Sequence, residues 1–272
     1  MSILVVPSFE DLVADYQNTA AHNDRLFWRL SELTWADPDL SAHRRHIEQN
    51  ELGFGHAVFH AMWLRLLDNA KRRFGTVQAL EIGVYKGQVI SLWAVIGRAW
   101  NIDIRISAIT PLSGQPMPRS SFVTWLRKHL DPNFREQLRN ANFYAQADYL
   151  TLIRQLFDQF EVNFEDVCLY HGYSTDQRIL ERVANQSFHI IYVDGDHTFH
   201  GALHDFKVFG PKVVKGGWLV ADDAGCSLPG SAFWKGHEAV SAAVKILPDT
   251  GFRNILNVGH NRIYERVTDS HG

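Results

Sequence analysis

The sequence is poor in cysteine, in long apolar runs and in excess charge. Only two of its 272 residues are cysteines, too few for a disulfide framework or a zinc site made of four thiolates. No apolar run approaches the roughly 18 residues that a membrane-spanning helix needs, and the N-terminus lacks the segments of a signal peptide. A net charge of −3 argues against a broad nucleic-acid-binding surface. We therefore expect a cytoplasmic protein that binds neither membranes nor nucleic acid.

Apolar residues are abundant, and their arrangement predicts the fold. Hydrophobic residues make up 46% of the chain and charged residues 21%, which allows a packed core and excludes disorder throughout. Short apolar runs alternate with segments of helical length, which predicts a doubly wound, Rossmann-like, mostly parallel sheet. The last apolar pair surrounds Gly259-His260-Asn261 and predicts a C-terminal antiparallel strand pair. The parallel strands are expected at residues 77–82, 102–110, 166–172, 188–196 and 218–223.

Two regions fall outside this alternation. Residues 1–56 are polar and aromatic, and they predict a helical N-terminal extension that is broken at Asp37-Pro38-Asp39. The stretch 113–143 contains three prolines and predicts an insertion or lid. The expected organisation is thus the extension 1–56 followed by a domain 57–272 with an insertion near 113–143. The extension also offers a subunit contact for a homo-oligomer.

The first predicted strand ends in a glycine-containing turn, Glu81-Ile82-Gly83-Val84-Tyr85-Lys86-Gly87. Gly83 and Gly87 let the backbone turn sharply and let a ligand come close to the N-terminus of the following helix. A tight turn without a ligand is the alternative. The spacing is not the G-x-G-x-x-G of dinucleotide-binding domains, and no acid follows the second strand, so a nicotinamide-dependent dehydrogenase is disfavoured.

Acidic residues follow two strands that are expected to be neighbours in the sheet. Asp194 ends the fourth strand, and Asp222 and Asp223 end the fifth. Because an isolated buried carboxylate is costly, such residues are expected to be solvated, paired or bound to metal. Three carboxylates at one edge of a sheet can hold Mg²⁺ or Ca²⁺; turn and capping roles are the alternative. His197 follows at the start of the next helix and is a candidate general base.

Four motifs in this order, EIGVYKG, HGYSTD, YVDGDHTF and KGGWLVADDAG, carry a family resemblance. Together they resemble class I S-adenosylmethionine-dependent methyltransferases. They are most similar to the metal-dependent O-methyltransferases that modify sugar hydroxyls of macrolides and other glycosylated natural products. The resemblance extends from Ala57 to Val267.

The resemblance implies a set of residues that bind S-adenosyl-L-methionine. Glu81, Gly83 and Gly87 match the motif that holds the amino-acid part of this cofactor. Tyr173 and Ser174 match the segment near the adenine. The second strand ends in Thr110, where the family usually has an acid for the ribose hydroxyls. The resemblance therefore implies that Thr110 makes a weaker contact with the ribose, or that another residue binds it.

The resemblance also implies a catalytic centre and a reaction. Asp194, Asp222 and Asp223 match the metal-binding acids of the family, with Mg²⁺ as the expected divalent ion, and Asp194 is also a catalytic candidate. His197 lies where related catechol-type enzymes have a lysine base. We expect metal-dependent methyl transfer to a hydroxyl of a sugar or glycosylated small molecule, by in-line displacement. The alternative is a non-catalytic protein that binds a cofactor or a partner on the same fold.

Overall fold

A computed structural model describes residues 7–114, 117–139 and 144–268 of the chain. Seven strands form one sheet within these residues. The strands are β1 (Val77–Ile82), β2 (Ile104–Thr110), β3 (Cys168–His171), β4 (Phe188–Val193), β5 (Val213–Ala221), β6 (Phe252–Val258) and β7 (Asn261–Arg266). The α-helices are α1 (Phe9–Ala14), α2 (Ala20–Ala36), α3 (Pro38–Gln49), α4 (Val58–Phe74), α5 (Gln88–Ala99), α6 (Ser121–Leu130), α7 (Pro132–Arg139), α8 (Tyr149–Gln159), α9 (Gln177–Val183), α10 (Phe199–Phe209) and α11 (Glu238–Ala243).

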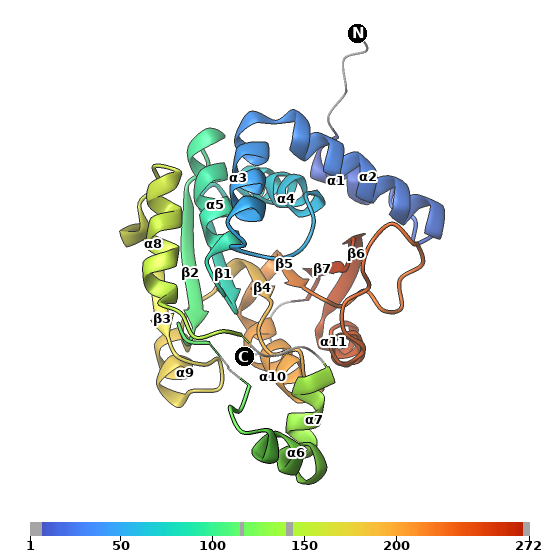
Figure 1. The fold of residues 1–272 in the computed structure, drawn as a ribbon. Coiled ribbons are helices and arrows are strands. Elements are labelled where there is room, and N and C mark those ends of the chain that lie inside the picture. Colours follow the sequence, from blue (N-terminus) through green and yellow to red (C-terminus); the bar gives the residue numbers. More distant parts are fainter. Residues whose placement is uncertain (1–6, 115–116, 140–143, 269–272) are drawn as a thin grey trace.

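The strand order is β3-β2-β1-β4-β5-β7-β6, and only β7 departs from the parallel direction of the strands beside it, pairing antiparallel with both β5 and β6. The chain winds from β1 out to β3 on one side and then returns to place β4 on the other side of β1 (Figure 1). Ligands bind at such a switch point, outside the carboxyl ends of the strands. The expected doubly wound sheet with a C-terminal antiparallel pair is confirmed.

Helices cover both faces of the sheet, and alternate residues of each strand face the two layers. On β1, Val77 and Ala79 pack into the core beneath α4, α5 and the N-terminal helices, whereas Leu80 and Ile82 pack against α9, α10 and α11. Trp63 of α4 is fully buried in the first layer. Both faces of the sheet are therefore packed against helices, and this packing positions the loops at its carboxyl edge.

Four of the five predicted parallel strands differ in extent from those in the structure, and the fifth strand differs most. The fifth parallel strand, expected at 218–223, is β5, which already begins at Val213 and ends at Ala221. Its first half pairs irregularly with β4, with a register shift after Phe188, and Gly216 has a φ of +77°. Between β5 and β6, helix α11 ends at Ala243 and continues as the 3-10 turn Val244–Ile246.

Helices α1, α2 and α3 lie over one side of the sheet layer (Figure 1). Phe9, Leu26 and Leu40 share one hydrophobic core with α4 and α5, so the division at residue 56 stays a prediction. The insertion near 113–143 forms α6 and α7, whereas residues 115–116 and 140–143 lie outside the described part. None of the described residues of α6 is buried. Among the described helices, none combines the length and the apolar character required to span a membrane.

Candidate active site

The loop between β1 and α5 makes a tight turn at the edge of the sheet. The φ angles of Gly83, Tyr85 and Gly87 are +96°, +48° and +90°, in the left-handed region that favours glycine. The amide of Gly83 donates to the carbonyl of Ile109 at the end of β2. A Cβ atom on Gly83 would lie 2.0 Å from the backbone oxygen of Asp194. The turn therefore packs directly against the loop after β4.

A matched pair of substitutions tests this close approach. In Gly83→Ala, a methyl group would have to displace the backbone of Asp194, so we expect a loss of more than about 3 kcal/mol in unfolding free energy. Gly75→Ala is the control, because Gly75 has a similar φ of +77° but a Cβ added there would meet no described atom within 4 Å, and we expect a loss of about 1–3 kcal/mol from backbone strain alone. Urea unfolding of both variants measures the difference. Equal losses would contradict the packing argument.

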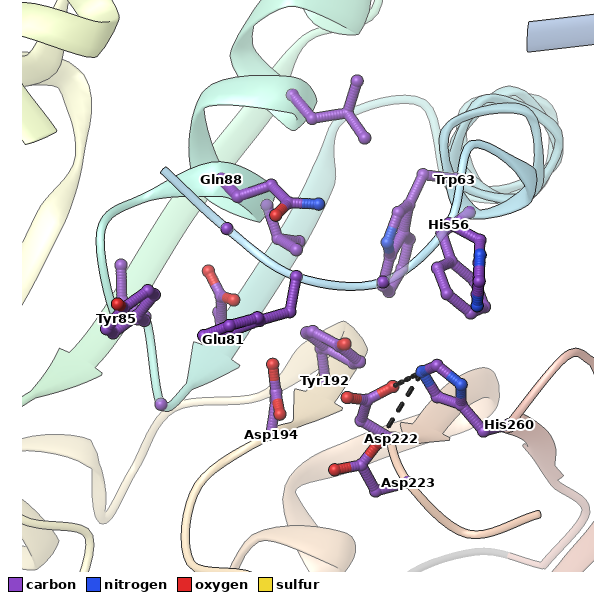
Figure 2. Close-up of a pocket in the computed structure, with 18 of the residues that line it drawn as sticks. His56, Trp63, Glu81, Tyr85, Gln88, Tyr192, Asp194, Asp222, Asp223 and His260 are labelled. Atoms are coloured by element: carbon purple, nitrogen blue, oxygen red, sulfur yellow. Dashed lines mark ion pairs between the residues drawn. The ribbon is translucent and has the colours of Figure 1, made fainter. Parts of the chain in front are cut away.

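A first cavity of about 550 Å³ opens at the carboxyl ends of β1, β4 and β5. Figure 2 shows Glu81, Asp194, Asp222 and Asp223 directed into it from three strand ends, with His260 beside the last two. Glu81 is 1% exposed, and its Oε2 has no hydrogen-bond partner among the described residues. Burial raises the pKa of Glu81 well above its usual value, and Asp222 adds to this effect. A ligand cation near Glu81 would relieve this cost.

A second cavity of about 510 Å³ adjoins the first, because Gly83 and Asp194 line both. The second cavity is lined by Thr110, which ends β2, and by Tyr173 and Ser174, which follow β3. The structure thus gathers these three predicted residues around one space. Gly87, which was also predicted to bind the cofactor, lines neither of these two cavities. It is the N-cap residue of α5.

Thr110 is a constrained residue at the end of β2. It is 3% exposed, and its Oγ1 accepts a hydrogen bond from the amide of Leu112 at 3.2 Å. Gln137 of α7 lines the same cavity. The insertion therefore brings an amide side chain to the cavity that Thr110 lines, which the sequence did not predict.

The three predicted acids lie at neighbouring strand ends. The amide of Asp194 donates to Ile82 O, and that of Asp222 donates to Val193 O, which continues the sheet ladder beyond β4 and β5. Asp223 has a φ of +53°, a strained conformation for a residue other than glycine. This turn directs two successive carboxylates toward one cavity.

Burial and mutual repulsion dominate the electrostatics of the acids. Burial raises the pKa of Asp194 well above its usual value, and the charges of Asp222 and Asp223 raise it further. Burial and Asp222 together raise the pKa of Asp223 to about 8. Burial also acts to raise the pKa of Asp222, but His260 and other groups overcome this and lower it to about 2. Such a cluster is stabilised by a cation.

His197 lies where the sequence predicts a base. Its Nε2 is 3.4 Å from Asp223 Oδ2 and 3.7 Å from Asp194 Oδ1. Its ring stacks on that of His237, with centroids 4.6 Å apart and an interplanar angle of 22°. His237 Nε2 is itself 3.5 Å from Asp223 Oδ2. Burial, with a contribution from His197, lowers the pKa of His237 to about 4, so His237 is neutral at pH 7.

Several cavity residues were missed by the sequence analysis. His237 and His260 come from the loop before α11 and from the turn between β6 and β7, and no motif spacing connects them to the acids. Tyr144 lines both cavities, and Trp234, half exposed, lines the first. Two aromatic residues of the N-terminal third also line the first cavity: Trp63, which is 1% exposed, and Phe54, which is 69% exposed.

Comparisons with known proteins identify the family of this chain. A family described as a methyltransferase domain matches residues 80–224, which run from the end of β1 to just beyond Asp223. The fold and the strand-end site define the class of S-adenosylmethionine-dependent methyltransferases. The chain belongs to this methyltransferase-domain family, and the resemblance found in the sequence is confirmed. No match was found among curated protein sequences.

Solved structures share the fold. The O-methyltransferase NovP is 17% identical, with a TM-score of 0.54 over 76% of this chain and 78% of NovP. The calicheamicin methyltransferase CalS11 is 16% identical, with a TM-score of 0.52 over 97% of this chain and 99% of its own. A Staphylococcus aureus protein assigned as a caffeoyl-CoA O-methyltransferase is 14% identical, with a TM-score of 0.56 over 90% and 99%.

Proposed function

We propose that this protein transfers a methyl group from S-adenosylmethionine to a hydroxyl group of a small molecule, with a divalent metal ion at the site. A sugar or a glycosylated compound is the favoured acceptor. The observation that carries the proposal is the convergence of Asp194, Asp222 and Asp223 in the first cavity, where Asp194 also lines the second. The names of NovP and CalS11 support the enzyme class.

The residues present fit the methyl donor. Glu81, whose buried Oε2 lacks a hydrogen-bond partner among the described residues, suits the donor's ammonium group, and the Gly83 turn leaves its backbone accessible. The second cavity would take the adenosine, with Tyr173 and Ser174 near the adenine. Thr110 and Gln137 are the polar groups positioned for the ribose hydroxyls. This placement leaves the rest of the first cavity for the acceptor.

The residues present also fit a divalent ion. Asp194, Asp222 and Asp223 offer carboxylate oxygens, the donors that Mg²⁺ prefers. Asp222 is buried, so its charge is poorly solvated and is suited to a bound cation. When bound, such an ion supplies Lewis-acid activation of the acceptor hydroxyl. By holding the ion, the three carboxylates would fix the position of this hydroxyl.

His197 is the proposed base. The acceptor oxygen forms a bond to the methyl carbon while the carbon–sulfur bond breaks, and the electron pair of that bond stays on sulfur. The proton of the hydroxyl passes to a ring nitrogen of His197. Asp194 and Asp223 lie beside His197 and stabilise the imidazolium that results. Because no covalent enzyme intermediate is needed, catalysis depends on positioning and on activation of the hydroxyl.

Calorimetric titration of S-adenosylmethionine tests the proposal first. We expect micromolar binding both with Mg²⁺ and with EDTA, because the two cavities meet at a preformed turn. Binding in these buffers would direct the next assays to hydroxylated acceptors. An absence of heat in both, verified by fluorescence competition, would contradict the enzyme assignment and favour a scaffold that binds a partner.

A cytoplasmic location is also proposed, and Cys168 and Cys226 form no disulfide.

A further inference from the structure

The turn between β6 and β7 carries a buried histidine to the acid cluster. Strand β7 runs antiparallel to β5, with Arg262 opposite Ala221, so the residue preceding β7 lies beside those that follow β5. The carbonyl of His260 accepts a hydrogen bond from the amide of Ala224 at 3.0 Å, which fixes the turn to the loop after Asp223. His260 is 4% exposed. The antiparallel pair therefore contributes a side chain to the site.

The His260 ring faces two carboxylates. Its Nε2 is 3.3 Å from Asp222 Oδ1 and 3.6 Å from Asp223 Oδ1 (Figure 2). One ligand atom from each of the three residues lies within 4.8 Å of the others. Atoms that bind one ion at about 2.1 Å are separated by roughly 3.0–3.5 Å, depending on the coordination geometry. The spacing of these three side chains is close to that of ligands around a single ion.

We propose that His260 is a nitrogen ligand of the ion held by Asp222 and Asp223, and that the site consequently prefers a transition-metal ion such as Co²⁺ or Zn²⁺ to Mg²⁺. The inference rests on the metal site of the proposed function and revises its expected ion. Imidazole nitrogen suits Zn²⁺ and its neighbours in the first transition row, whereas Mg²⁺ takes oxygen ligands. A mixed nitrogen and oxygen site therefore discriminates against Mg²⁺.

A second group of histidines lies on the other side of Asp223. His197 and His237 approach Asp223 Oδ2 at 3.4 and 3.5 Å, and their side chains are 13% and 14% exposed, compared with 5% for His260. His260 instead approaches Oδ1 of both Asp222 and Asp223. The geometry therefore assigns His260 to the ion. His197 and His237, which are more exposed, remain available to face the acceptor substrate.

Metal titration and spin-echo spectroscopy test this ligand. The full-length protein is stripped with EDTA and titrated calorimetrically with CoCl₂ or MgCl₂. We expect Co²⁺ to bind at least about tenfold more tightly than Mg²⁺. His260→Asn should weaken Co²⁺ binding by about 10- to 100-fold and change Mg²⁺ binding by less than about threefold. Electron spin-echo modulation of the Mn²⁺-loaded wild type should show a directly bound imidazole nitrogen, which His260→Asn removes.

His237→Asn is the matched control and should keep the nitrogen signal. Loss of the signal in His237→Asn but not in His260→Asn would overturn the assignment, as would equal affinity for Co²⁺ and Mg²⁺. If His260→Asn fails to fold, the wild-type spectrum decides, because bound Mn²⁺ without a nitrogen signal contradicts the proposal. A wild type that binds none of the ions refutes the metal site itself, whereas the titration with S-adenosylmethionine tests the methyltransferase assignment separately.

Discussion

Replacing Asp222 by alanine is expected to lower metal-dependent methyl transfer by about 10³-fold or more. The Asp222 carboxylate is buried between Asp194, Asp223 and His260, so its removal takes away a ligand that no neighbouring group replaces. Turnover is measured with a hydroxylated acceptor across a range of Mg²⁺, Mn²⁺ and Co²⁺ concentrations. Binding of S-adenosylhomocysteine should change by less than about threefold, because the adenosine part of the cofactor is placed in the second cavity, which Asp222 does not line.

Glu238→Ala provides the control for the lost negative charge. Glu238 is an exposed acid in the first turn of α11, so its removal changes the net charge without altering the cluster. We expect its turnover to stay within about twofold of the wild type. Unchanged turnover in Asp222→Ala would refute the metal assignment. A parallel loss of cofactor binding in Asp222→Ala would instead indicate that the acids shape the whole cavity.

Replacing His197 by alanine is expected to slow methyl transfer by roughly 10²- to 10⁴-fold. The imidazole is the nitrogen base next to Asp194 and Asp223, and an alcohol is a poor nucleophile while it keeps its proton. The loss should fall on kcat more than on the KM for the methyl donor, since His197 does not line the second cavity. The pH–rate profile should also lose its acidic limb, because that limb reports protonation of the base.

His200→Ala is the matched control for His197. His200 is exposed in the first turn of α10, three residues after His197, and its removal should leave kcat within about twofold of the wild type. A loss below about threefold in His197→Ala would transfer the role of base to Asp194 or to a water molecule. Loss of the acidic limb in both variants would show that the profile reports another group.

The resemblance of the motifs and the fold class were accessible from the sequence because each depends on local patterns. A buried strand followed by Gly83, or by Asp194, can be read from a few consecutive residues. The parallel arrangement then follows from alternation of strands and helices. For this reason the sequence alone also placed Asp194 next to Asp222 and Asp223, since neighbouring parallel strands end at the same edge.

The irregular start of β5 was not predictable in this way. Val213 and the glycines that follow it have the composition of a turn, yet pairing with β4 extends them as strand around a register shift. Tertiary pairing here overrode local preference. The insertion gave a similar result, because its prolines predicted a separate segment but could not show that Gln137 within it, and Tyr144 just after it, line the cavities.

The sequence by itself thus determined the sheet, the class of enzyme and the three acids that carry the proposed metal chemistry. The tertiary structure alone decided which histidines meet those acids. His237 depends on the course of a long loop, and His260 depends on the antiparallel register that sets Arg262 opposite Ala221. Such registers are fixed by side-chain packing between distant segments, which leaves no periodic signal around either residue. The nitrogen ligand proposed for the metal ion therefore emerges only when the strands are paired.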